Sequence, residues 1–145
     1  MGVENNFEIR RLNLEDLDAV SVLELLFGQA TYPRATEEFL RQDGYHLLVA
    51  FDHSPPVGFV SGVEMTHPDK GTEMFLYDLA VAERFRRRGS GRQLVEALMA
   101  LARRRGCYGM WVLTETENTA AVRTYRSTGG GAGKTCLMFD WRFDN

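Results

Sequence analysis

The residues whose types and spacing most clearly predict chemistry form one short stretch: Arg86, Arg87, Arg88, Gly89, Ser90 and Gly91. Its two glycines allow the backbone to approach a ligand closely, and arginine offers paired donors for phosphate oxygens. The stretch follows an apolar run and precedes an amphipathic pattern, so a helix beginning there would direct free N–H groups at the same ligand. The sequence therefore predicts a binding site for a phosphate-bearing ligand between a strand and a helix.

Two further side chains are candidates for proton transfer. Asp78 is the one acid within the apolar run 74–81, where a charge is costly unless it is paired or functional. The structural alternative for Asp78 is an acid that accepts backbone hydrogen bonds at a bulge. Tyr125 lies on the apolar side of a helical pattern at 119–128, and its alternative is a ring in the core with its hydroxyl at the surface. The residues alone leave both alternatives open.

The arginines raise the question of nucleic-acid binding. Eight arginines and one glutamate between residues 84 and 105 give this segment a charge of +7, so the rest of the chain carries −10 within the net −3. Nucleic-acid binding is disfavoured, because that remainder is acidic and no aromatic residues alternate with the arginines. An acidic remainder instead favours a cationic small-molecule partner.

A second glycine-rich stretch, at 129–135, has only part of a P-loop pattern. The pattern requires glycine at the fifth position before Gly133, and Thr128 stands there. The residues that follow are strand-like rather than helical. The stretch is therefore interpreted as a turn before the last strand.

Hydrophobic periodicity predicts an α/β (α+β) fold with a mixed sheet that would position these groups. Strands are expected at 7–10, 45–51, 57–65, 74–81, 109–114 and 134–143, and helices at 14–27, 35–41, 92–105 and 119–128. The strand–loop–helix–strand run at 74–114 is typical of a parallel crossover unit. With 145 residues, 44% of them apolar, and no repeat or linker, the chain is expected to form a single domain over 1–145.

These patterns resemble those of the Gcn5-related N-acetyltransferase (GNAT) superfamily. The Arg-x-x-Gly-x-Gly pattern at 86–91, entered from the apolar residues 79–81, resembles the acetyl-CoA signature of that superfamily. The segment 117–129 resembles its helix with the pattern Asn-x-x-Ala followed by Tyr-x-x-x-Gly. The resemblance implies a mixed central sheet flanked by about four helices, in which the strands at 74–81 and 109–114 splay apart to form a cofactor slot.

The resemblance also implies acetyl-CoA as cosubstrate and no metal. Backbone groups of the strand would bind pantetheine and polarise the thioester carbonyl, and the amides of the loop would bind the pyrophosphate. The implied cofactor-binding residues are Leu79, Ala80, Val81, Arg86, Arg87, Arg88, Gly89, Ser90, Gly91, Asn118, Ala121 and Tyr125. Asn118 is equally an ordinary helix-capping residue, and the two roles are compatible.

The remaining roles are also implied by the resemblance. Tyr125 would protonate the departing thiolate, and Asp78 and Glu115 are the candidates for the catalytic base. Asp78, Glu115 and Asp140 would bind the ammonium groups of a polycationic substrate. A solvated surface carboxylate is the alternative for Glu115 and Asp140, and no strong base is needed if neighbouring charges lower the pKa of the substrate amine.

Within the superfamily, short matches along the chain are most similar to the small aminoglycoside 3-N-acetyltransferases. They include the segments 26–28, 75–81 and 139–140. The resemblance implies direct acetyl transfer, in a ternary complex, to the 3-amino group of an aminoglycoside, and hence antibiotic resistance. The alternatives are a polyamine, an amino acid or a protein N-terminus as acceptor, or a CoA-binding sensor without turnover.

Location and assembly are predicted from simpler features. Neither a long apolar run nor a signal peptide is visible, which favours a cytoplasmic protein without membrane contact. Cys107 and Cys136 have no disulfide-framework or metal spacing, and the three histidines are not clustered. The family resemblance also suggests a homodimer formed through the terminal strand.

Overall fold

A five-stranded mixed sheet forms the centre of the structure, a computed structural model that describes residues 7–144. The strands β1 (Glu8–Arg11), β2 (Tyr45–Phe51), β3 (Pro56–His67) and β4 (Gly71–Val81) follow one another as antiparallel neighbours. β5 (Met110–Val112) then pairs with β4 in parallel, after a helical crossover. This mixed sheet with helices on its faces confirms the predicted fold class.

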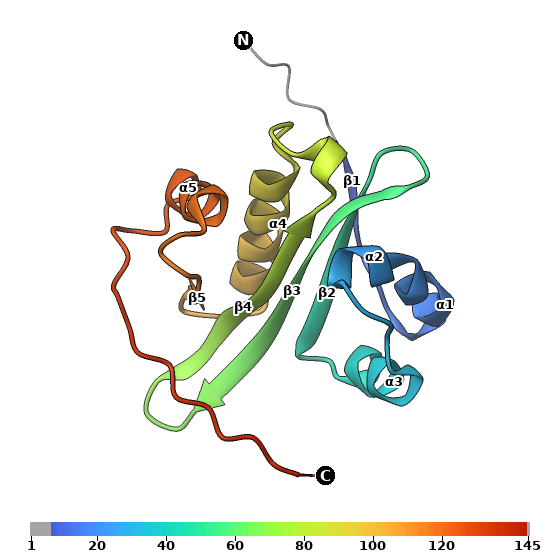
Figure 1. The fold of residues 1–145 in the computed structure, drawn as a ribbon. Helices are drawn as coiled ribbons and strands as arrows, with labels where there is room; N and C mark the ends of the chain where they lie inside the picture. The colour runs from blue at the N-terminus through green and yellow to red at the C-terminus, as the bar shows by residue number, and fades with distance from the viewer. Residues whose placement is uncertain (1–6, 145) are drawn as a thin grey trace.

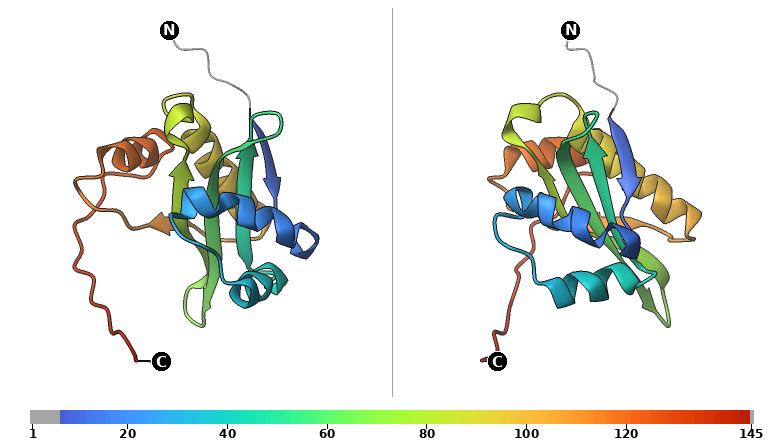
Figure 2. Two further views of the ribbon diagram at one scale, coloured as in Figure 1. Left: turned by 45° about the vertical axis from the view of Figure 1, so that its right-hand side comes forward. Right: turned by 90° about the vertical axis from the view of Figure 1, so that its right-hand side faces the viewer.

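Helices cover the sheet on both faces (Figures 1 and 2). α4 (Ser90–Arg104) lies on one face with α5 (Thr119–Ser127) beside it. α1 (Leu17–Val20), α2 (Glu24–Phe27) and α3 (Pro33–Arg41) lie on the other face. Short 3-10 turns complete the chain at Leu14–Asp16, Ser21–Leu23 and Glu83–Phe85.

The segment expected to form one helix at 14–27 is instead broken into short pieces. Asn13 caps its start, because its side chain accepts the N–H of Glu15 and its own N–H donates to the Asp16 carboxylate. The segment ends at Gly28, whose φ of 82° is left-handed. α3 begins at Pro33, two residues earlier than expected, because proline fits the first helical turn.

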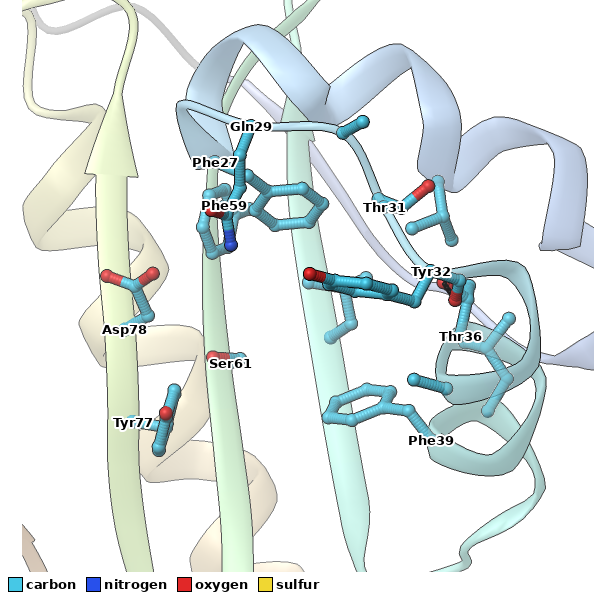
Figure 3. Close-up of a pocket in the computed structure, with 15 residues that line it drawn as sticks. Phe27, Gln29, Thr31, Tyr32, Thr36, Phe39, Phe59, Ser61, Tyr77 and Asp78 are labelled. Carbon is cyan, nitrogen blue, oxygen red and sulfur yellow. Dashed lines mark hydrogen bonds between the residues drawn. The ribbon is translucent and has the colours of Figure 1, made fainter. Parts of the chain in front are cut away.

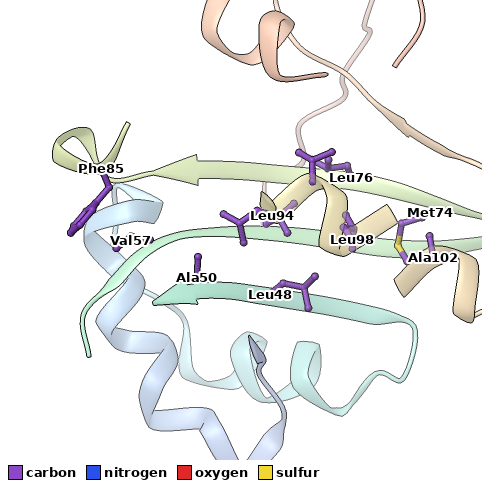
Figure 4. Close-up of a cluster of buried hydrophobic side chains, with 11 residues drawn as sticks. Leu48, Ala50, Val57, Met74, Leu76, Phe85, Leu94, Leu98 and Ala102 are labelled. Carbon is purple, nitrogen blue, oxygen red and sulfur yellow. The ribbon is translucent and has the colours of Figure 1, made fainter. Parts of the chain in front are cut away.

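Alternation along the strands gives the sheet two buried faces. In β2, Leu48 and Ala50 pack on the α4 side, whereas Leu47 and Val49 pack on the side of α1 to α3. The α4-side core is completed by Val57, Val60, Met74, Leu76, Phe85, Leu94, Val95, Leu98 and Ala102 (Figure 4). Burial on both faces holds the sheet firmly between its helices.

α4 packs closely on β3 at Gly62. A Cβ added there would lie 2.9 Å from Cδ1 of Leu98, closer than real Cβ contacts, and 3.0 Å from Sδ of Met74, which is also very tight. The glycine lets the helix pack directly on the sheet. The close contact lies at the middle of α4, where Leu98 meets the sheet.

The predicted strand at 134–143 is wrong. The chain is extended there but forms no strand, and Leu137, Phe139 and Trp141 are 84%, 73% and 77% exposed. A strand needs a neighbour for its backbone hydrogen bonds. Three glycines with positive φ between 129 and 133 turn the chain, and the tail leaves the body instead of returning to β5 (Figure 1).

Candidate active site

A β-bulge in β4 brings two neighbouring side chains to one side of the sheet. Ser61 pairs with Asp78 and Gly62 pairs with Leu76, so Tyr77 is the extra residue between them. In a regular strand, Tyr77 and Asp78 would point to opposite faces. Here both line the same pocket, on the side of the sheet covered by α1 to α3.

The bulge lies where β4 and β5 part. Three residue pairs join the two strands, and the pairing ends at Leu76 and Val112. Beyond that point, the β4 segment from Asp78 to Val81 has no parallel neighbour. The pairing thus ends as the predicted splay requires, and the unpaired β4 edge beside the bulge is hereafter called the slot.

The loop from β4 to α4 is shaped by two left-handed residues. Arg87 has a φ of 65° and Gly89 a φ of 84°, and α4 begins immediately afterwards at Ser90. The Gly89 carbonyl accepts the first helical hydrogen bond, from the Gln93 N–H, at 2.9 Å. The N–H groups of Ser90 and Gly91 fall in the first helical turn, where N–H groups have no acceptor within the helix. Such a turn has the geometry that an anion site requires.

The exposed arginine side chains of this loop make different contacts. Arg86 donates through Nε to the Val81 carbonyl at 3.3 Å, and its backbone N–H donates to the Glu83 carbonyl. The Arg88 guanidinium lies 5.4 Å from the centroid of the Phe85 ring. Because the Arg86 N–H already has an acceptor, the backbone amides left for the predicted pyrophosphate binding are those after Arg86.

α5 lies against the same loop. The Asn118 side chain accepts the N–H of Ala121 at 3.2 Å, so Asn118 caps the helix as expected. A Cβ at Gly91 would meet side-chain atoms of Val81 at 3.7 Å and of Thr124 at 3.9 Å. The start of α4, the end of β4 and α5 therefore converge at Gly91.

Tyr125 is half-buried beside the core on the α4 side. Its pKa is raised, chiefly by burial and further by the negative charge of Asp78. Gly130 donates its N–H to the Tyr125 carbonyl at 2.9 Å, and a Cβ there would lie 2.7 Å from that oxygen. Gly130 therefore anchors the end of α5.

A pocket of about 410 Å³ lies next to Asp78, between the sheet and the α1–α3 region (Figure 3). Asp78, Tyr77 and Ser61 form its strand wall, and Tyr32 and Phe39 project from the opposite, helical wall. The other lining residues are Val20, Phe27, Gln29, Ala30, Thr31, Ala35, Thr36, Leu40, Leu47 and Phe59. Among these described lining residues Asp78 is the one carboxylate, so the pocket is largely apolar with a single acid at its edge.

Asp78 remains open to solvent, although the pocket wall shields its carboxyl in part. This burial raises the pKa of the carboxyl above the ordinary aspartate value, and a hydrogen bond from the Leu79 N–H opposes the rise. A carboxylate with a raised pKa accepts a proton more readily than an ordinary surface aspartate. These features fit the predicted role of Asp78 as a general base, which stays a prediction.

Glu115 and Asp140 are not among the residues that line this pocket. Glu115 is exposed after β5, where its carbonyl accepts the Asn118 N–H. Asp140 lies in the exposed tail, with its carboxylate 3.4 Å from Nε of Arg142. Of these candidates Asp78 alone lines the pocket, Tyr125 is linked to it by the effect of the Asp78 charge on its pKa, and the roles of all four residues stay predictions.

Sequence patterns do not reveal the aromatic part of the pocket. Tyr32 and Phe39 come from the α2–α3 region, and Tyr77 comes from β4. None of the three belongs to a motif. The nearest signal is the position of Tyr77 next to the isolated acid of an apolar run.

The described part of the chain, residues 7–144, holds neither a metal-binding cluster nor a membrane-spanning helix. Within this range, no three His, Cys, Asp or Glu side chains are placed to hold a metal ion. No helix of the described chain has the length and apolar character needed to cross a membrane. Cys107 is half-buried and Cys136 is exposed, and both are free thiols.

Similarity to known proteins agrees with this geometry. The model of the acetyltransferase (GNAT) family matches residues 13–129. A [ribosomal protein bS18]-alanine N-acetyltransferase of Salmonella typhimurium is 39% identical over 57 residues, which make up 39% of this chain. The match spans only 38% of that relative's length.

Solved structures share the fold over nearly the whole chain. An aminoglycoside acetyltransferase from an uncultured soil metagenomic sample, in complex with sisomicin, superposes with a TM-score of 0.88 at 22% identity, over 95% of this chain and 97% of that chain. The aminoglycoside N-acetyltransferase AAC(6')-Iy, in complex with the bisubstrate analogue CoA-S-monomethyl-acetylneamine, gives 0.82 at 22% identity, over 96% and 100%. Because the family model spans most of its length, the chain belongs to the acetyltransferase (GNAT) family and is an N-acetyltransferase.

Proposed function

We propose that this chain transfers the acetyl group of acetyl-CoA to an amine of an aminoglycoside while both substrates are bound. The observation that carries the proposal is the position of Asp78. It lies at the edge of the pocket described above, hereafter the acceptor pocket, and at the bulge where β4 and β5 part. An acceptor in the pocket and a donor in the slot would therefore meet at Asp78.

The residues around the slot fit acetyl-CoA, which supplies an activated acetyl thioester when bound. The N–H groups of Ser90 and Gly91 have no acceptor within the helix at the start of α4, and the exposed side chains of Arg87 and Arg88 can add donors for phosphate. The β4 edge at Leu79–Val81 offers backbone groups to a pantetheine arm. Asn118 and Ala121, at the start of α5, would contact the cofactor from the other side.

The proton transfers follow from the positions of two side chains. Asp78 accepts a proton from the acceptor ammonium, directly or through a water molecule. The amine nitrogen then bonds to the acetyl carbon as the carbon–sulfur bond breaks, and its second proton passes through water to restore the Tyr125 hydroxyl. Tyr125 donates its hydroxyl proton to the departing thiolate, and its raised pKa keeps it protonated until then. Glu115 is the alternative base.

Two observations support an aminoglycoside as acceptor. One solved relative with this fold is bound to sisomicin, and the chain outside the arginine-rich segment is acidic. Glu115 and Asp140 would hold further ammonium groups of such a polycation. The sequence resemblance suggests the 3-amino group, whereas the relative designated AAC(6')-Iy raises the 6′ position. NMR of the acetylated product distinguishes the two.

The amine of a protein N-terminus is the second candidate acceptor. It is favoured by the 39% identity over 57 residues to the ribosomal-protein alanine N-acetyltransferase. A short peptide that begins with alanine is the corresponding probe. Acetylation of that peptide in preference to any aminoglycoside would move the second candidate ahead of the first.

We further propose a cytoplasmic homodimer that does not bind nucleic acid. The tail at 134–143 exposes large apolar side chains, and β5 is a short edge strand. Exchange of tails between two copies would give each tail a neighbouring strand. The free thiols fit the reducing environment of the cytoplasm. Light scattering on the purified protein should show two chains per particle, and a monomer at micromolar concentration would contradict this assembly.

The acceptor is tested by free-thiol release from acetyl-CoA with sisomicin, spermidine and the alanine peptide. We expect release with sisomicin, together with a product heavier by one acetyl group. No release with any aminoglycoside would remove this acceptor class. Binding of acetyl-CoA in a calorimeter, without release by any amine, would favour a non-catalytic sensor.

A further inference from the structure

The acceptor pocket exposes two tyrosines on facing walls. Tyr32 is 73% exposed and Tyr77 is 70% exposed. In Figure 3, Tyr32 reaches from the connection between α2 and α3 toward the sheet, while Tyr77 stands on β4 next to Asp78. Aromatic rings left this open offer binding area that the fold itself does not use.

Both tyrosines are held in place by their backbones. Tyr32 precedes Pro33, which restricts it to the extended region, and its carbonyl accepts the N–H and the hydroxyl of Thr36, each at 2.8 Å. Tyr77 is the extra residue of the bulge, and its ring meets the Phe75 ring edge-on at a centroid distance of 5.9 Å. The two walls are therefore preorganised for a ligand.

The polar groups of the pocket fit a single positive charge. Asp78 is the one carboxylate among the described lining residues, and none of them is lysine, arginine or histidine. The Thr31 hydroxyl contacts the Glu24 carboxylate at 3.1 Å, and the Thr36 hydroxyl is bound to a carbonyl of its own helix. A few polar groups thus orient a ligand whose body meets mainly apolar and aromatic surface.

The volume limits how much of an acceptor can enter. The pocket of about 410 Å³ lies near the small end of the roughly 300–1,000 Å³ that small-molecule sites occupy. We infer that it binds one amine-bearing ring, with the ring faces against Tyr32 and Tyr77 and the amine at Asp78. The pocket would then select acceptors by that ring rather than by their number of charges, and the rest of a polycation would stay outside. This inference rests on the proposed acetyl transfer to an amine.

Three amines of different shape and charge test this selection. Cyclohexylmethylamine has one ring and one charge, spermidine has three charges and no ring, and sisomicin has both rings and charges. In Tyr32→Ala and Tyr77→Ala, we expect KM for the two cyclic amines to rise at least about tenfold, because the stacking contact is lost. KM for spermidine and for acetyl-CoA should stay unchanged. Tyr32→Phe and Tyr77→Phe should behave like the unaltered protein, because they keep the ring.

Tyr108→Ala is the matched control. Tyr108 is 58% exposed and lies near Gly71, at the opposite end of β4, so its loss should change no KM. Equal use of spermidine and cyclohexylmethylamine, or alanine variants with unchanged KM for cyclic amines, would overturn the inference while leaving acetyl transfer intact. If no amine releases thiol with the unaltered protein, the proposed function fails and this inference with it.

Discussion

The slot and the acceptor pocket meet at Asp78 but are built in different ways. The slot depends on backbone: the end of strand pairing at Leu76 and the left-handed residues at 87 and 89. The pocket depends on side chains from distant parts of the chain, such as Tyr32, Phe59 and Tyr77. A backbone site can be encoded in one short stretch of sequence, whereas a side-chain pocket exists only once the whole fold has formed. The proposed donor site is therefore encoded in one short stretch of sequence, whereas the proposed acceptor site depends on the complete fold.

Asp78 belongs to both regions, so its substitution should have the largest effect. Asp78→Asn keeps the shape but removes the base, and we expect kcat/KM to fall about 10²–10⁴-fold. Affinity for acetyl-CoA should change little, because the loop and the β4 backbone stay intact. Thiol release and calorimetry measure the two quantities. Glu38→Gln, at an exposed carboxylate 3.8 Å from Arg34, is the control, and full activity in Asp78→Asn would remove Asp78 from the mechanism.

The pH dependence separates the chemistry of Asp78 from its place in the pocket. Burial raises the pKa of this carboxyl above 3.8. Because only the ionised form accepts a proton, kcat/KM should fall as the pH drops through that raised pKa. The Asp78→Asn variant should lack this decline. An identical decline in both proteins would assign it to another group.

In the proposed mechanism Tyr125 only donates a proton to the departing thiolate, so its loss should lower kcat without changing either KM. Tyr125→Phe keeps the ring in the core and removes the proton donor, and we expect kcat to fall about a hundredfold. KM for both substrates should stay close to the unaltered values. Steady-state kinetics with saturating acceptor measure the effect. A changed KM with unchanged kcat would assign Tyr125 to binding.

A smaller effect is expected when only the shape of the loop is changed. Alanine in the left-handed region costs about 1–2 kcal/mol, so Gly89→Ala should raise KM for acetyl-CoA up to about tenfold and leave acceptor KM unchanged. Gly106→Ala is the matched control. Gly106 has a φ of 83° with no neighbour within 4 Å of an added Cβ, so its substitution should lower the melting temperature without affecting either KM. Equal kinetic effects of the two variants would remove the loop from cofactor binding.

The contrast between the backbone-built slot and the side-chain-built acceptor pocket also explains what could be predicted from the sequence. The strand, loop and helix at 74–104 follow from local periodicity and glycine placement, and the structure confirms their order. The strand expected at 134–143 has the right apolar pattern, but a strand also needs a partner, and the tail does not pair with the free edge of β5. The pairing of Tyr32 with Tyr77 depends on the path of the chain between them. No local pattern encodes that path.

His46 tests whether the fall in kcat/KM at low pH comes from the site or from a loss of folding stability. It is fully buried in β2, where Nδ1 accepts from Nε of Arg11 at 2.9 Å and Nε2 lies 2.7 Å from the Glu64 carboxylate. Burial is the main cause that lowers its pKa below 6.5, and the hydrogen bond to Glu64 opposes the shift. The unfolded chain therefore takes up a proton at a higher pH than the folded chain does. Stability should decline as pH falls below 6.5, by at most about 1.4 kcal/mol per pH unit.

Denaturant unfolding at pH 7.5 and 5.5 measures this decline in the unaltered protein and in His46→Gln. Glutamine does not titrate, so the variant should lose less stability between the two pH values. Its kcat/KM should still fall as Asp78 becomes protonated, because the acceptor pocket and the slot are unchanged. If the decline in kcat/KM at low pH disappears in His46→Gln but persists in Asp78→Asn, its cause is the protonation of His46 in the sheet. Asp78 would then no longer be assigned as the base.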